Sequence, residues 1–174
     1  MSEIQNLFNK SQFRSSKYKK YFSNYDEILA KFKGKDVKII EIGVQDGGSL
    51  EIWKEYFGAN SKIFGIDLNP QSKKFEVGNV KIFIGSQSSK KFWTDLFNQI
   101  GKVDIVIDDG GHTNTQQIIT AVKCIPNIKD GGMLITEDVH SSYLKRFGNP
   151  SKYSFINFVK KMIDDINSLY PNLK

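Results

Sequence analysis

Hydrophobic residues follow two alternating spacings along this chain, and the alternation predicts strands separated by helices. Short apolar runs rich in β-branched residues predict five strands, which cover residues 37–42, 62–67, 80–84, 103–108 and 132–137. Apolar residues at helical spacing predict helices over residues 25–33, 50–57, 90–100, 115–124 and 154–169. Ser49 is expected to cap the second of these helices. The order is typical of an α/β fold with a Rossmann-like, doubly wound and mainly parallel sheet.

The length of 174 residues predicts one domain with its own core. Residues 1–24 are polar and aromatic without a clean period, so we expect an N-terminal arm or irregular cap there, and the core in residues 25–174. Residues 139–152 form a mostly irregular stretch that is longer than a typical connection. It follows a pair of acids, where a lid would belong.

The composition limits the cellular locations and the classes of partner that we expect for this protein. No apolar run approaches the length of a membrane span, and the N-terminus has no signal-peptide pattern, so no membrane partner is expected. Cys124 is the single cysteine, which excludes an internal disulfide and favours a cytoplasmic location. The net charge of +6 comes from scattered lysines, with Arg14 and Arg146 as the only arginines. Solvated helix faces explain most of that charge, and nucleic acid is an unlikely partner.

Acidic motifs follow two consecutive predicted strands. They are DDGGH at residues 108–112 and EDVH at residues 137–140. The carboxyl ends of parallel strands meet at one edge of a sheet, where open α/β folds bind ligands. A lone histidine or carboxylate in such a place is more often a loop residue or a helix cap. Four carboxylates at one edge would repel one another without a cation, and oxygen ligands of this kind hold Mg²⁺. The pair of motifs therefore predicts a metal site.

The turn after the first strand predicts a cofactor loop. From Gly43 it reads GVQDGG, which lacks the second glycine of the dinucleotide fingerprint and places an aspartate where a diphosphate would be repelled. Glu41 is placed to hold the cationic methionine end of S-adenosylmethionine, and its alternative is a strand carboxylate paired with a lysine. Asp67 is placed to accept hydrogen bonds from a ribose diol, as in NAD enzymes, and its alternative is a helix or turn cap. Gln87 is placed near an adenine, although a plain loop is an equal alternative. The residues predicted to bind the cofactor are Glu41, Gly43, Gly47, Ser49, Asp67, Gln87 and Asp108.

Taken together, five motifs resemble those of class I methyltransferases that O-methylate sugars on macrolides and other antibiotics. Relatives of that family act on bacterial surface polysaccharides. The motifs are EIGVxxGxS at 41–49, ID at 66–67, GSQS at 85–88, VDIVIDDGGH at 103–112 and ITEDVHSSY at 135–143. The resemblance covers roughly residues 21–160, and its most specific part is the pairing of DDGxH with EDxH.

The resemblance implies an O-methyltransferase that uses S-adenosyl-L-methionine and Mg²⁺ on a small-molecule or saccharide acceptor. It implies Asp109, Glu137 and Asp138 as metal ligands, and His112, with Asp109, as the catalytic residues, His112 being the base. Gly111 stands where a serine is more usual in the family. We expect Asp108 to support the cofactor. His140 is a second candidate base or substrate contact, and Tyr143 a lining residue of the pocket.

The resemblance also implies a sixth and a seventh strand after the last helix, but nothing β-like follows residue 169. We therefore expect a sheet that lacks its last strands, a catalytically compromised core, and an open edge that favours a homo-oligomer. Two alternatives to an active methyltransferase stay open. They are an NAD(P)-binding oxidoreductase and an inactive cofactor-binding subunit.

Overall fold

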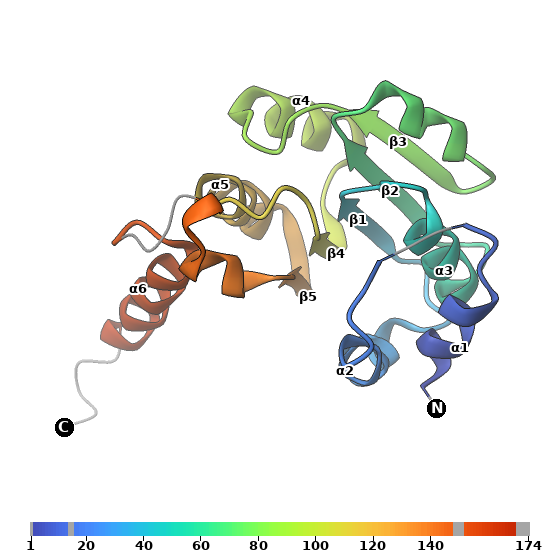
Figure 1. Ribbon diagram of the computed structural model, residues 1–174, viewed down its shortest axis with the longest axis horizontal. Helices are drawn as coiled ribbons and strands as arrows, with labels where there is room; N and C mark the ends of the chain where they lie inside the picture. Colours follow the sequence, from blue (N-terminus) through green and yellow to red (C-terminus); the bar gives the residue numbers. More distant parts are fainter. Residues whose placement is uncertain (1, 14–15, 148–151, 170–174) are drawn as a thin grey trace.

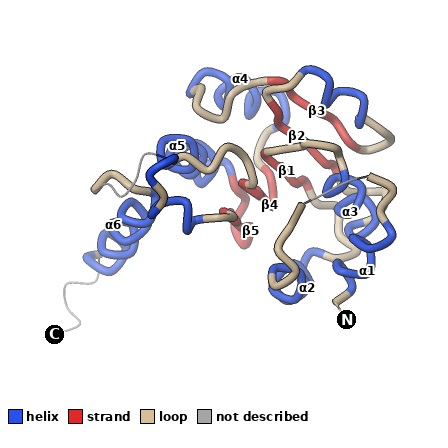
Figure 2. The backbone as a smooth tube through the Cα atoms, viewed as in Figure 1, coloured by secondary structure: helices blue, strands red, loops and turns tan. Residues whose placement is uncertain are grey.

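The computed structural model describes residues 2–13, 16–147 and 152–169, and five parallel strands form its centre (Figures 1 and 2). The order across the sheet is β3-β2-β1-β4-β5. Ile42 lies opposite both Ile66 and Asp108, and Asp108 lies opposite Thr136, so four strands end level with one another. The strands are β1 (Lys38–Ile42), β2 (Lys62–Asp67), β3 (Val80–Ile84), β4 (Val103–Asp108) and β5 (Ile128–Thr136).

Helices cover both faces of the sheet because the side chains of each strand alternate between two apolar layers. Ile39 packs in one buried cluster with Ile4 and Trp53, whereas its neighbour Ile40 packs in the other cluster with Trp93. The first layer contains α1 (Glu3–Lys10), α2 (Tyr21–Leu29) and α3 (Gly48–Phe57). The second contains α4 (Lys90–Ile100) and α5 (Asn114–Cys124), and α6 (Phe155–Ser168) packs beside α5 (Figure 1).

The predicted fold class is confirmed, and so is the place of every predicted strand. The largest difference lies in β5, which begins at Ile128 instead of residue 132. Gly131, with a φ of 78°, and Gly132 lie inside this strand, and its register against β4 shifts between Val103 and Ile105. Glycine is uncommon in strands, so the sequence pattern places the start of this strand at residue 132 and leaves out residues 128–131.

The N-terminal segment is more ordered than its sequence pattern indicates. Helix α1 begins after Ser2, whose hydroxyl oxygen accepts a hydrogen bond from the Gln5 N–H, and Ile4 is buried. Helix α2 begins at Tyr21, four residues earlier than predicted. Eight residues are too few to display a clear period, and packing stabilises such short helices more than propensity does. The domain boundary at residue 24 stays a prediction.

The start of α3 also differs from the prediction. Gly47 precedes the helix with a φ of 78°, and Ser49 is the second residue inside it. The hydroxyl of Ser49 hydrogen bonds to Glu41 and not to the helix backbone as a cap would. The prediction of Ser49 as a cap was therefore wrong.

At one edge of the sheet, β5 pairs with β4 on one side only, and no strand follows it within residues 137–147 and 152–169. Self-association through this edge stays a prediction. Among the described residues, no helix combines the length and the apolar character that a membrane span requires.

Candidate functional site

A cavity of about 530 Å³ opens at the carboxyl ends of the strands, within the usual range for small-molecule sites of roughly 300–1,000 Å³. Its wall comes from the loops after β1, β2, β3 and β4, with contributions from Ser16 and Asp138. Predicted site residues in the wall are Gly43, Asp67, Gln87, Asp109, His112 and Asp138. The strand ends therefore meet at one site, as the sequence predicts.

Gly43 and Gly47 shape the turn after β1. Gly43 has a φ of 93°, and a Cβ there would lie 2.2 Å from the carbonyl oxygen of Asp109. A Cβ on Gly47 would lie 2.6 Å from the ring of Phe75. Both positions require glycine, because backbone or an aromatic ring fills the space of a side chain. Gly43 faces the cavity, whereas Gly47 is not one of its lining residues.

Asp67 fastens the cofactor loop through hydrogen bonds from backbone N–H groups. Its Oδ2 accepts from Val44 at 3.0 Å and from Gln45 at 3.1 Å, and its Oδ1 accepts from Asn69 at 2.8 Å. Carboxylate oxygens accept more than one hydrogen bond, so lone pairs remain for a ligand in the cavity. The predicted contact with a ribose diol stays a prediction.

Gln87 braces the loop that carries the DDGGH motif. Its Nε2 donates to Asp108 Oδ1 at 3.0 Å and to Thr120 Oγ1 at 3.1 Å, while its Oε1 accepts from the Gly111 N–H at 2.9 Å. Both amide hydrogens are thus used inside the protein, and the predicted hydrogen bond to adenine stays a prediction. Asp108 is buried beneath this loop, burial raises the pKa of its carboxyl group, and it does not line the cavity.

Glu41 lies behind the cavity wall. Its side chain is fully buried and accepts a hydrogen bond from the Trp53 indole N–H at 3.0 Å and another from Ser49. Burial raises the pKa of Glu41 to about 7, although Lys17 opposes the rise. Neither Glu41 nor Ser49 lines the cavity, so their predicted contact with the cofactor stays a prediction.

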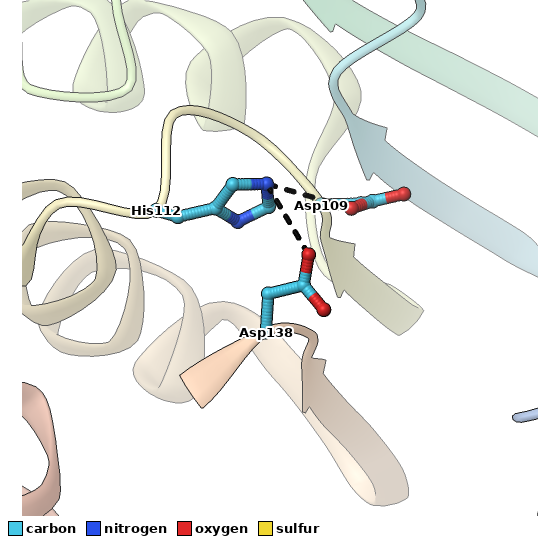
Figure 3. Close-up of side chains that lie close together, drawn as sticks. All are labelled: Asp109, His112 and Asp138. Atoms are coloured by element: carbon cyan, nitrogen blue, oxygen red, sulfur yellow. Dashed lines mark ion pairs between the residues drawn. The ribbon is translucent and has the colours of Figure 1, made fainter. Parts of the chain in front are cut away.

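Three side chains come together just after the carboxyl ends of β4 and β5, and they are Asp109, His112 and Asp138 (Figure 3). The Nε2 atom of His112 lies 3.9 Å from Asp109 Oδ1 and 3.7 Å from Asp138 Oδ2. His112 and Asp138 both have positive φ, 57° and 52°, and such strained backbone is typical of functional sites. One atom from each of the three side chains lies within 4.8 Å of the others, a group able to hold a metal ion.

Glu137 turns toward Lys17 and lies outside that group. Lys17 Nζ lies 2.6 Å from Glu137 Oε1, 2.8 Å from Asp109 Oδ2 and 3.3 Å from Glu41 Oε1, and its side chain is 2% exposed. The Tyr25 hydroxyl donates to the same oxygen of Glu137. Burial lowers the pKa of Lys17, but the carboxylates outweigh burial and hold it well above the usual value. Burial raises the pKa of Glu137.

Sequence and structure comparisons find several similar O-methyltransferases, although no protein-family model matches the chain. The 8-demethyl-8-alpha-L-rhamnosyl tetracenomycin-C 2'-O-methyltransferase of Streptomyces olivaceus is 30% identical over 163 residues, 87% of this chain and 43% of the relative. The demethylmacrocin O-methyltransferase of Streptomyces fradiae is 29% identical over 82% of this chain and 39% of the relative.

A solved structure of MycE methyltransferase from the mycinamycin biosynthetic pathway, in complex with Mg and SAH, has a TM-score of 0.83. It is 26% identical, and the match covers 96% of this chain and 45% of MycE. The chain has the class I methyltransferase fold and resembles antibiotic sugar O-methyltransferases. It spans less than half the length of these relatives.

Two further predicted residues do not line this cavity. His140 is exposed and lines a neighbouring depression of about 630 Å³ together with Tyr18, Lys19, Lys20 and Tyr21. Tyr143 lies at another depression, beside α6, and not at the cavity.

The predicted lid begins with two short 3-10 turns, Val139–Tyr143 and Lys145–Phe147. The Ser141 hydroxyl donates to the His112 carbonyl at 2.8 Å, which fastens the first turn to the DDGGH loop. Residues 148–151 of the predicted lid lie outside the described residues. Movement of this stretch stays a prediction.

Sequence reasoning missed Lys17, Tyr21 and Tyr25 as residues of the site. Tyr21 and Tyr25 lie four residues apart, a spacing that places side chains on one side of a helix, and Lys17 lies four residues before Tyr21. Lys17 and Tyr21 belong to the predicted arm of residues 1–24, whose aromatic and basic residues follow no extended apolar period, and Tyr25 begins the helix predicted over residues 25–33. Its contacts are with residues about a hundred positions further along the chain, which no local pattern indicates.

Proposed function

We propose that this chain is the core of an S-adenosylmethionine-dependent O-methyltransferase that acts, with Mg²⁺, on a hydroxyl group of a sugar. One observation carries the proposal: a cavity of cofactor size lies directly beside the Asp109, His112 and Asp138 group. The similar enzymes are named as O-methyltransferases of rhamnosyl tetracenomycin and macrocin derivatives. A bacterial surface polysaccharide precursor is an acceptor of the same chemical class.

The cluster of Asp109, His112 and Asp138, called the acid group below, offers ligand atoms that suit Mg²⁺. Asp109 and Asp138 are half-buried and offer carboxylate oxygens, which this ion prefers, whereas imidazole suits softer metals. We therefore assign Asp109 and Asp138 to the metal and His112 to proton transfer. Glu137 is the third ligand that the resemblance implies, through the oxygen that Lys17 and Tyr25 do not hold. A metal ion bound here supplies a positive charge that lowers the pKa of an acceptor hydroxyl.

His112 is the proposed general base. Its Nε2 atom faces the two aspartates, so a hydroxyl held between these groups lies within reach of it. The acceptor oxygen forms its bond to the methyl carbon while the carbon–sulfur bond of the cofactor breaks, and the hydroxyl proton passes to Nε2. The Ser141 hydrogen bond to the His112 carbonyl holds the residue in place during this transfer.

We place the cofactor in the 530 Å³ cavity, along Gly43 and Asp67. The glycine brings the backbone close to the ligand, and Asp67 offers carboxylate lone pairs to hydroxyl donors. MycE provides the supporting comparison, because it was solved with S-adenosylhomocysteine and Mg. Glu41 lies behind the wall of this cavity, where it accepts hydrogen bonds from Trp53 and Ser49.

We place the acceptor over the depression next to Asp138. Tyr18 and Tyr21 offer aromatic surface there, and Lys19 and Lys20 add positive charge. These side chains favour a saccharide that carries an acidic group, such as a precursor of an acidic surface polysaccharide. We also propose a cytoplasmic location, which the single buried cysteine supports.

The test is methyl transfer from labelled S-adenosylmethionine to a panel of neutral and acidic saccharides, with Mg²⁺ or with chelator. Because the core is expected to be catalytically compromised, we expect slow transfer that chelator abolishes and that Mg²⁺ restores, and no transfer by Asp109→Asn. Calorimetry with S-adenosylhomocysteine and NADH separates the alternatives. Binding of NADH alone would indicate an oxidoreductase, and cofactor binding without transfer to any acceptor would indicate an inactive subunit.

A further inference from the structure

One short N-terminal segment forms hydrogen bonds with the three carboxylates at and beside the acid group, which are Asp109, Glu137 and Asp138. Lys17 donates to Asp109 and Glu137, at 2.8 and 2.6 Å. Tyr21 donates its hydroxyl hydrogen to Asp138 Oδ1 at 3.1 Å, and Tyr25 donates to Glu137. Tyr21 and Tyr25 lie one turn apart on α2, and Lys17 lies four residues before that helix begins. A single docked segment therefore reaches all three acids that the resemblance implies as metal ligands.

The two oxygens of Asp109 and of Asp138 face different partners. Asp109 gives Oδ2 to Lys17 and turns Oδ1 toward His112, which lies 3.9 Å away. Asp138 gives Oδ1 to Tyr21 and turns Oδ2 toward His112, at 3.7 Å. The ammonium group of Lys17 thus contacts Asp109 on the side that faces away from His112. In each aspartate the N-terminal segment holds one oxygen and leaves the other for a ligand.

We propose that Lys17, Tyr21 and Tyr25 are positioning residues that fix the orientation of the carboxylates for a small divalent cation. Partners of this kind orient the groups that contact a metal, and their loss typically costs about 10–100-fold in affinity. Lys17 also offsets the repulsion among Glu41, Asp109 and Glu137, which lie around its one ammonium group. The inference rests on the metal role in the proposed function.

Orientation and charge have opposite effects on metal affinity, so affinity for one ion does not separate them. Removal of the ammonium group removes a repulsion that acts on every divalent cation alike. Loss of carboxylate orientation lowers the affinity for Mg²⁺ most, because this ion demands near-ideal octahedral geometry, whereas Ca²⁺ accepts flexible ligands. The ratio of Mg²⁺ to Ca²⁺ affinity therefore reports orientation, and the charge effect largely cancels from it.

The experiment measures Mg²⁺ and Ca²⁺ binding to the full chain by calorimetry, without cofactor or acceptor. The variants are Lys17→Met, Tyr21→Phe and Tyr25→Phe, and Lys161→Met and Tyr153→Phe serve as matched controls on exposed positions. We expect the Mg²⁺ to Ca²⁺ affinity ratio to fall about tenfold or more in the three variants and to stay unchanged in the controls. Tyr21→Phe removes one hydroxyl group from a half-buried side chain, so it keeps the test valid if Lys17→Met does not fold.

Two outcomes would overturn the inference in distinguishable ways. If the unaltered chain and Asp109→Asn bind Mg²⁺ equally weakly, the metal role in the proposed function fails and the inference fails with it. If Asp109→Asn abolishes binding but the affinity ratio is the same in Tyr21→Phe, Tyr25→Phe and the unaltered chain, the proposed metal site stands. The N-terminal segment then has no positioning role.

Discussion

The carboxylates in the two halves of the site have different hydrogen-bond donors. The half around Asp67 is called the cofactor side, and the half around Asp109, Glu137 and Asp138 the acid side. On the cofactor side, Asp67 accepts from backbone N–H groups that lie 2, 22 and 23 residues away in sequence. On the acid side, Asp109 and Glu137 depend on the side chain of Lys17, which is 92 and 120 residues away. Backbone donors belong to the loop itself, whereas Lys17 is in place only when the N-terminal segment is docked. The cofactor side should therefore tolerate changes near the N-terminus that disrupt the acid side.

The largest expected effect concerns chemistry on the acid side alone. His112→Ala should lower the rate of methyl transfer by about 10²–10⁴-fold, because a general base is lost. Affinity for S-adenosylhomocysteine should stay close to that of the unaltered chain, since the cofactor side keeps its contacts. Steady-state rates and calorimetry on one preparation measure both quantities. An equal loss of cofactor affinity would mean that the two halves are not separable.

The same difference explains which parts of the molecule the sequence predicts. Strand ends are local features, so the motifs around Gly43, Asp67, Asp109 and Asp138 were found, and four of those strand ends do meet at one edge. The parallel sheet follows from alternation of strands and helices, which is also a local pattern. The burial of Glu41 behind the cavity wall does not follow from such a local pattern, because it depends on how α3 packs against β1.

Long-range contacts account for most of what sequence reasoning missed. Lys17 is one of many lysines, and no pattern near it indicates that its ammonium group lies among three carboxylates. Helix α1 is too short to display its period. Gln87 was found as a site residue, but its role as a brace depends on Thr120 and Gly111, which belong to other elements.

The next effect tests how much the acid side depends on the N-terminal segment. Lys17→Met should lower the free energy of unfolding by about 3–5 kcal/mol, because it leaves buried carboxylates without their counter-ion. Lys17 is almost fully buried, so solvent screens this interaction little. Urea denaturation followed by circular dichroism measures the change, with Lys161→Met as the control for an exposed ion pair. A loss below about 1 kcal/mol, the usual value for surface pairs, would contradict the comparison.

The raised pKa of the Glu41 carboxyl group should be visible in the pH dependence of the unfolding free energy. Its pKa rises from an ordinary 4.5 to about 7 in the folded protein, chiefly through burial. The folded state then binds the proton more tightly, so this contribution is fully present below pH 4.5 and is lost as the pH rises toward 7. The difference corresponds to about 3 kcal/mol at most, since one pKa unit is worth about 1.4 kcal/mol.

Replacement by glutamine removes the titration of Glu41 and keeps the shape of the side chain. Glu41→Gln should therefore flatten the fall in unfolding free energy between pH 4.5 and pH 7, while the contributions of Glu137 and Asp108 remain. Urea denaturation at several pH values measures both curves. Parallel curves for the two proteins would show that folding does not raise the pKa of Glu41.

The smallest expected effect belongs to the cofactor side, where the donors are local. Asp67→Ala leaves three backbone N–H groups of the cofactor loop without their acceptor, so affinity for S-adenosylhomocysteine should fall about tenfold. Asp67→Asn keeps one side-chain oxygen and should lose less. The exposed Glu55→Ala is the control for removal of a carboxylate.

Affinity for Mg²⁺ should be unchanged in all three variants, because Asp67 has no contact with the acid group. A parallel loss of Mg²⁺ affinity in Asp67→Ala would show that the loop after β1 influences the position of Asp109, through the close approach of the two loops at Gly43. The two sides of the site would then be one structural unit, joined at that glycine.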